Sequence, residues 1–117
     1  MFMNGLAIII IASLLLLAVT RLTVERVAHN HHAQKVSFFN RYPVQPGDIV
    51  FLGDSITDGA RWDELFPGLP VKNRGINANL TTNVLERLDN IVNWRPKAIF
   101  ILIGTNDTGK MLSVQGA

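Results

Sequence analysis

Two short, uninterrupted apolar runs, Ile49–Leu52 and Ala98–Ile103, constrain the fold of this 117-residue chain more than any other feature. Runs of this length are typical of strands buried on both faces of a parallel sheet. Between them the sequence predicts a short helix at Trp62–Phe66, a short strand at Val71–Asn73 and a helix over Leu80–Trp94. Such alternation predicts parallel strands joined by right-handed crossovers, and therefore an α/β fold.

The helix over 80–94 is expected to be amphipathic and to end before Arg95-Pro96. Its apolar residues recur at helical spacing, so we expect them to share one buried face. These residues are Leu80, Val84, Leu85, Leu88, Ile91 and Val92.

The N-terminal segment Gly5–Val19 contains no charged residue, and the 19 residues that end at Val19 approach the ~20 that span a bilayer core. A cleaved signal peptide is the alternative, but the segment lacks a basic n-region and a good small-x-small cleavage site. We therefore expect a single-pass membrane anchor over residues 1–20. The basic residues that follow it are too few to decide which side of the membrane the rest of the chain occupies.

Residues 21–47 are predicted to be a juxtamembrane linker, and two prolines and Gly47 mark its C-terminal end. His29 and His32 have the i, i+3 spacing that a helical metal site uses. No Asp, Glu or Cys lies beside them to complete a ligand set, so a solvated tether is the preferred interpretation. The folded domain is then expected over residues 48–117.

Composition excludes several classes of function. Eleven Lys and Arg against nine Asp and Glu leave a net charge of +2, too small to indicate a nucleic-acid partner. The chain has no cysteine, which excludes a thiol nucleophile, a disulfide framework and a Cys-ligated metal.

Polar turns follow all three predicted strands: Gly53-Asp54-Ser55, Asn73-Arg74-Gly75 and Gly104–Asp107. In open parallel sheets, ligands bind beyond the carboxyl ends of the strands. Ser55 supplies a hydroxyl nucleophile and, at the start of a helix, an unpaired backbone N–H. The N–H of Gly75 and the side-chain amide of Asn106 are further donors for an oxyanion. Together these groups form half of an acyl-transfer site.

Each turn also has a purely structural explanation. The serine turn can be a helix cap, Gly75 can serve a positive-φ turn, and Asn106-Asp107 can form an Asx turn. Their joint occurrence at three successive strand ends favours the catalytic interpretation.

The segments "FLGDSITDG", "VKNRGINANLTTNVLERLD" and "IFILIGTNDTG" resemble the first three sequence blocks of the SGNH (GDSL-type) esterase family, in its platelet-activating-factor acetylhydrolase-like branch. The resemblance implies that Ser55 is the nucleophile, and that the Ser55 and Gly75 N–H groups and the Asn106 side chain form the oxyanion hole. Asp54 and Asp107 are expected to support them. It also implies a three-layer α/β/α sandwich with a flavodoxin-like parallel sheet, here incomplete with about three strands, and no metal or organic cofactor.

The family's fourth signature, an Asp-x-x-His block, does not occur, and no histidine follows His32. We therefore expect the N-terminal part of a longer enzyme, inactive by itself, with the 98–103 strand exposed at a sheet edge. The expected substrate is a small-molecule or glycan-linked ester with a short acyl group. The alternatives are an inactive membrane-anchored fragment, an O-acyltransferase of the same fold and, remotely, a nucleotide-binding P-loop at Gly104–Met111. The oligomeric state stays open.

Overall fold

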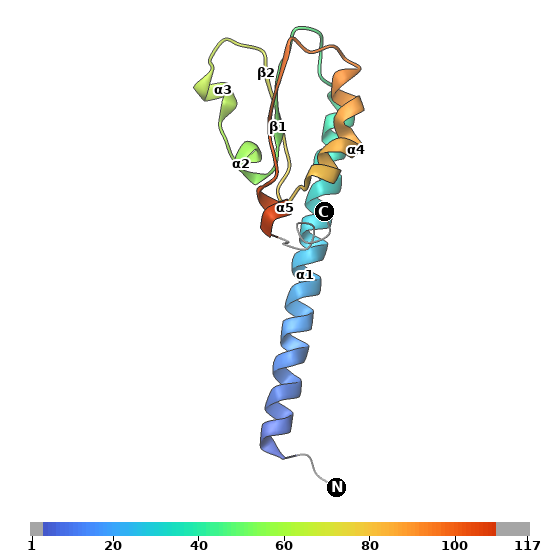
Figure 1. Cartoon of the computed structure of the whole chain (residues 1–117), viewed down its shortest axis with the longest axis vertical. Coiled ribbons are helices and arrows are strands. Elements are labelled where there is room, and N and C mark those ends of the chain that lie inside the picture. Colours follow the sequence, from blue (N-terminus) through green and yellow to red (C-terminus); the bar gives the residue numbers. More distant parts are fainter. Residues whose placement is uncertain (1–3, 110–117) are drawn as a thin grey trace. The chain divides into compact units, whose positions relative to one another are not determined.

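A computed structural model describes residues 4–109 (Figure 1). The helices and strands alternate after a long first helix, as the sequence predicts. In chain order they are α1 (Gly5–Arg41), β1 (Ile49–Gly53), α2 (Ser55–Asp58), α3 (Trp62–Leu65), β2 (Val71–Gly75), α4 (Thr81–Val92), β3 (Ala98–Leu102) and α5 (Thr105–Gly109).

The three strands form one parallel sheet in the order β2-β1-β3. The predicted α/β class is therefore confirmed, and β1 lies between the other two strands. Gly53, at the end of β1, pairs with Gly75 on one side and with Leu102 on the other. The carboxyl ends of the strands are thus level, and all three polar turns begin at the same edge of the sheet.

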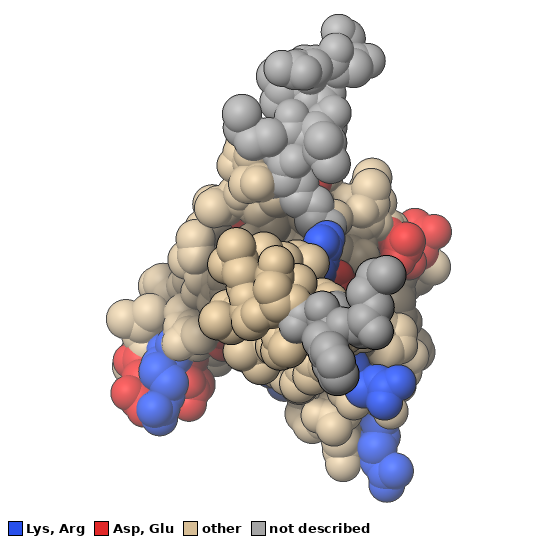
Figure 2. Space-filling view, turned by 90° about the horizontal axis from the view of Figure 1, so that it is seen from below, with Lys and Arg blue, Asp and Glu red and all other residues tan. Residues whose placement is uncertain are grey.

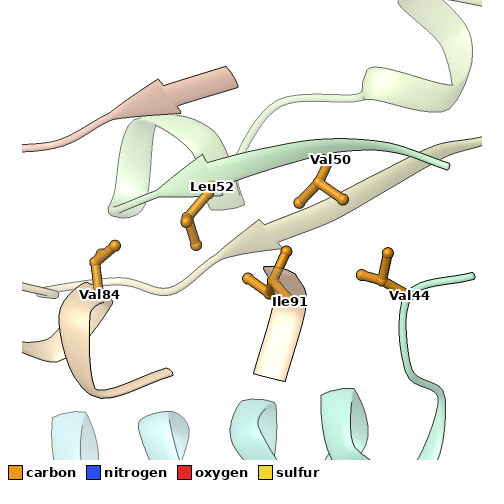
Figure 3. Packing of buried hydrophobic residues seen from close by; sticks show 5 residues of the cluster. All are labelled: Val44, Val50, Leu52, Val84 and Ile91. Carbon is orange, nitrogen blue, oxygen red and sulfur yellow. The ribbon is translucent and has the colours of Figure 1, made fainter. Parts of the chain in front are cut away.

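One face of the sheet packs against α4. Val50 and Leu52 of β1 point toward Val84 and Ile91 of α4, and Val44 closes the cluster (Figure 3). The burial of these five side chains removes apolar surface from water and stabilises the packing of α4 on the sheet.

The predicted apolar face of α4 is only partly correct. Leu85 is 67% exposed and Val92 is 47% exposed, whereas Arg87 is buried between Val84 and Ile91. The sequence pattern assigned residues to the buried face because they are apolar. In the structure, a residue of α4 is buried when its position faces β1 and β2, as positions 84, 87 and 91 do.

The other face of the sheet carries a layer of aromatic rings. The ring of Phe51 stacks on Trp62 with 3.8 Å between centroids, and the Phe66 and Phe100 rings lie 5.7 and 5.3 Å from it. Segments on both faces are therefore present, as a three-layer arrangement requires, although α2 and α3 are single turns.

The strand β3 forms an edge of the sheet within the described residues. Its residues Phe100, Ile101 and Leu102 are 57%, 55% and 54% exposed. The prediction that this strand is buried on both faces is thus wrong for the described part of the chain, and the prediction that it forms an exposed apolar edge is confirmed. The edge is open because no described segment pairs with it or covers it.

The chain divides into two compact units, residues 1–30 and 31–117, with the boundary inside α1. In the first unit the large apolar side chains of the helix are exposed. This helix is long and apolar enough to cross a membrane, although a signal sequence would meet the same criteria. The anchor over residues 1–20 therefore stays a prediction.

In the second unit the last turns of α1 belong to the packed structure. Phe39 is buried, and the guanidinium carbon of Arg74 lies 4.5 Å from the centroid of the Phe39 ring. Two of the histidines that we expected in a solvated tether form hydrogen bonds here, His31 with Asp58 and His32 with Asn79. The tether interpretation failed because these partners lie 27 and 47 residues away in the sequence.

Figure 2 shows charged residues dispersed over one face in small groups, one of which contains both basic and acidic side chains, with uncharged residues between the groups. No continuous basic stripe is visible on this face among the residues that the structure describes.

Candidate active site

Ser55 begins α2 directly after the end of β1, and its side chain is exposed. Asp54 is the N-cap of this helix, because its Oδ1 accepts a hydrogen bond of 3.0 Å from the N–H of Ile56. The turn is tight, since a Cβ on Gly53 would overlap the carbonyl oxygen of Leu102 and the hydroxyl of Thr57. A glycine before Asp54 therefore allows the strand to pass into the helix within one residue.

Gly75 ends β2 and is buried against α2. A Cβ at this position would overlap the backbone nitrogen of Asp58. The φ angle of Gly75 is not among the positive values in the described chain, so the residue serves close approach and not a left-handed turn. Its N–H donates a 2.9 Å hydrogen bond to Oδ1 of Asn73. Use of this N–H for an oxyanion requires Asn73 Oδ1 to move away or to share the donor.

Asn106 lies in the first turn of α5, just beyond β3. Its Nδ2 donates a 2.9 Å hydrogen bond to the carbonyl oxygen of Asn79. A side-chain amide carries two N–H donors, so one remains for a substrate. The neighbouring Asp107 accepts hydrogen bonds from the Thr81 N–H at 3.0 Å and from the Thr81 hydroxyl at 2.6 Å, which ties α5 to the start of α4.

Arg87 joins these turns from beneath, although the sequence patterns did not single it out. Its buried guanidinium donates to Asn79 Oδ1 at 3.1 Å, to the Arg74 carbonyl at 2.7 Å and to the Gly53 carbonyl at 3.1 Å. Burial, together with the nearby charge of Arg74, lowers the pKa of Arg87 to about 10. The side chain stays cationic at neutral pH. Its hydrogen bonds connect the end of β1, the end of β2 and Asn79 to one another. The sequence feature that could have indicated this role is a charged residue on the same helical face as the apolar residues Val84 and Ile91.

Asp58, the last residue of α2, is a second group that sequence reasoning missed. Its carboxylate accepts from Lys35 Nζ at 2.8 Å, from His31 Nε2 at 3.1 Å and from the Asn77 N–H at 3.2 Å. Burial raises the pKa of Asp58, but the hydrogen bonds from Lys35 and His31, the Lys35 charge and the Asn77 N–H outweigh it and lower the pKa below 3.8. The carboxylate is therefore ionised at neutral pH.

The second oxygen of Asp54, Oδ2, is buried and has no hydrogen-bond partner among the described residues. A buried carboxylate oxygen of this kind is costly unless a donor reaches it. Among the described contacts, Asp54 therefore supports α2 through Oδ1 alone.

The three histidines of the chain all lie on α1. Within residues 4–109, no group of three or more His, Asp or Glu side chains is arranged to hold a metal ion. The segment that we considered as a P-loop is Gly104–Met111. Its residues Thr105–Gly109 form helix α5, and Lys110 and Met111 lie outside the described residues.

Comparison with known proteins identifies the group to which this site belongs. The GDSL-like Lipase/Acylhydrolase family matches residues 51–117, which is more than half of the chain. The chain is 38% identical over 68 residues to the platelet-activating factor acetylhydrolase IB subunit alpha1 of Bos taurus, covering 53% of this chain and 29% of that protein. It is 39% identical over 66 residues to the alpha2 subunit of Homo sapiens, covering 51% of this chain and 29% of that protein.

A solved structure described as a platelet activating factor from Streptococcus pneumonia superimposes with a TM-score of 0.70 at 31% sequence identity. The match covers 85% of this chain and 49% of that structure. The chain thus spans about half of the similar structure and less than a third of the curated relatives. The chain belongs to the GDSL-like lipase/acylhydrolase family.

Proposed function

We propose that this protein is a serine ester hydrolase that acts on carboxylic esters with short acyl groups. The observation that carries the proposal is the exposed Ser55 at the start of α2. It lies two residues after Gly53, the last residue of β1, which pairs with Gly75 at the end of β2. Family membership supports the reaction class, and the acetylhydrolase names of the relatives support a short acyl group.

In this proposal the Ser55 Oγ attacks the ester carbonyl carbon. Negative charge develops on the carbonyl oxygen, and it is met by the Ser55 N–H and by the second N–H of Asn106. The N–H of Gly75 becomes a third donor when Asn73 Oδ1 gives it up. The alcohol then leaves, and water hydrolyses the acyl-serine.

The Ser55 proton requires a base, which the family pattern assigns to the histidine of an Asp-x-x-His block that this sequence does not contain. The reaction is therefore proposed for a protein in which that histidine reaches Ser55.

The test is labelling with an organophosphonate ester that reacts with activated serines, followed by mass mapping of the modified residue. We expect the label on Ser55, no label in Ser55→Ala, and unchanged labelling in Ser37→Ala, whose serine is exposed on α1. The label is applied to a protein that also carries the histidine of the Asp-x-x-His block, and a folded form of that protein that leaves Ser55 unmodified would refute the proposal.

A further inference from the structure

Two adjacent histidines of α1 contact different parts of the candidate active site. His31 Nε2 lies 3.1 Å from Asp58 Oδ2, and Lys35, one turn further along α1, lies 2.8 Å from Asp58 Oδ1. The Asp58 side chain is 10% exposed, while His31 and Lys35 are about a third exposed. Asp58 therefore receives hydrogen bonds from α1 at both of its carboxylate oxygens.

The helix that carries Asp58 needs such support. α2 consists of four residues, Ser55–Asp58, and a helix this short has no stability of its own. Its N-terminal end is held by the Asp54 cap, and its C-terminal end is held by the contacts of Asp58 with α1 and with the Asn77 N–H. The direction of the Ser55 N–H follows from the direction of this turn.

The second histidine contacts the residue that holds Asn106. Asn79 is 2% exposed, and its Nδ2 donates to His32 Nδ1 at 3.0 Å. Its Oδ1 accepts from Arg87, and its carbonyl oxygen accepts from Asn106. Arg87 has only donors, so the Asn79 amide cannot be flipped, and His32 must present Nδ1 as an acceptor.

We propose that His31 and His32 are positioning residues for the candidate active site. His31 acts through Asp58 on the orientation of α2, and His32 acts through Asn79 on the placement of Asn106. The inference rests on the proposed function, but its structural part is independent of turnover. In this proposal, the C-terminal part of α1 holds in place the groups that bind the oxyanion.

The first arm of the test is backbone hydrogen exchange on the full chain. His31→Ala is expected to speed exchange of the Asp58, Gly59 and Asn77 amides roughly tenfold, since a charged hydrogen bond is lost. His32→Ala is expected to do the same at Asn79. The matched control is His29→Ala, because His29 is exposed on the same helix and has no hydrogen bond among the described residues.

Conservative variants separate positioning from other roles. His31→Gln keeps a donor near the place of Nε2, and His32→Asn keeps an acceptor near the place of Nδ1, so both should restore slow exchange. Where turnover of a p-nitrophenyl ester is measurable, both alanine variants should lower kcat more than they change KM, and the conservative variants should recover most of it.

Unchanged exchange in both alanine variants would overturn the proposal. So would a His31→Gln variant with normal exchange but no labelling of Ser55, because that result would mark His31 as a proton acceptor. Suppose that a protein carrying the histidine of the Asp-x-x-His block fails to react at Ser55 while the expected exchange pattern is intact. That result would refute the proposed function and leave the role of His31 and His32 in placing α2 and Asn79 standing.

Discussion

The backbone N–H of Gly75 donates a 2.9 Å hydrogen bond to the side-chain oxygen of Asn73, two residues before it on β2. The Nδ2 of Asn73 in turn donates to the Asp58 carbonyl at 3.0 Å. The Asn73 amide thus connects the end of β2 to the end of α2. It also occupies the Gly75 N–H, which the sequence analysis predicted to be a donor to the oxyanion.

Replacement of this amide should loosen that connection. Asn73→Ala removes the hydrogen bonds to Gly75 and Asp58 and is expected to lower the free energy of unfolding by about 2 kcal/mol. Urea titration followed by circular dichroism measures it. Asn77→Ala is the control, because its interaction with Asp58 uses the backbone N–H, which alanine keeps. Equal losses in the two variants would contradict the role of the Asn73 side chain.

Gly75 should not tolerate a methyl group. In Gly75→Ala the new Cβ would overlap the backbone of Thr57 and Asp58, so β2 and α2 must separate, at a cost of about 1–3 kcal/mol. Gly109→Ala is the matched control, since no atom lies within 4 Å of a Cβ there. Thermal melting of both variants measures the difference, and a Gly75→Ala protein as stable as the control would refute the close packing.

Acid should weaken the attachment of α2. The pKa of Asp58 is lower in the folded state than its ordinary 3.8, so the unfolded chain binds the proton first as the pH falls. The stabilisation from this carboxylate is therefore present above pH 3.8, the pKa in the unfolded chain, and it is lost as the pH falls from there toward the lower pKa of the folded state.

Urea titrations between pH 3 and pH 6 measure this decline. Asp58→Asn should flatten it, and Asp63→Asn, at an exposed residue of α3, should leave it in place. A decline of the same size in Asp58→Asn would show that other carboxylates account for it.

The aromatic layer should depend on Trp62. Trp62→Ala removes the stack on Phe51 and the 2.9 Å hydrogen bond from the indole N–H to the Thr57 carbonyl. The expected loss is about 2–3 kcal/mol, below the cost for a fully buried ring because Trp62 is half-buried. Trp94→Ala is the control, since the Trp94 side chain is 43% exposed. Similar melting of both variants would mean that the stack contributes little.

The apolar N-terminal segment should keep the protein with membranes. Residues 5–19 are uncharged and form the exposed part of a helix, so the chain should sediment with membranes and resist alkaline carbonate extraction. Deletion of residues 1–19 should release it. A mature N-terminus near residue 20 would show instead that the segment is a cleaved signal.

The sequence by itself determined the elements whose patterns are local. The apolar run Ile49–Leu52 predicted a buried strand, and the polar turn after it predicted the start of a new element. The helix over 81–92 followed from the spacing of its apolar residues, and the parallel sheet followed from the alternation of strands and helices. The family blocks identified Ser55, Gly75 and Asn106 because they require fixed residues at fixed spacing.

Only the tertiary structure decided what each polar group contacts. The contacts that decide the site join segments 13–47 residues apart. They link Asn73 Nδ2 to the Asp58 carbonyl, Arg87 to the carbonyls of Arg74 and Gly53, and the histidines of α1 to Asp58 and Asn79. A hydrogen bond depends on direction and on a distance near 3 Å, which no local pattern encodes. The periodicity of a sequence specifies which face of a helix is apolar, but the neighbours of that face are chosen when the elements pack.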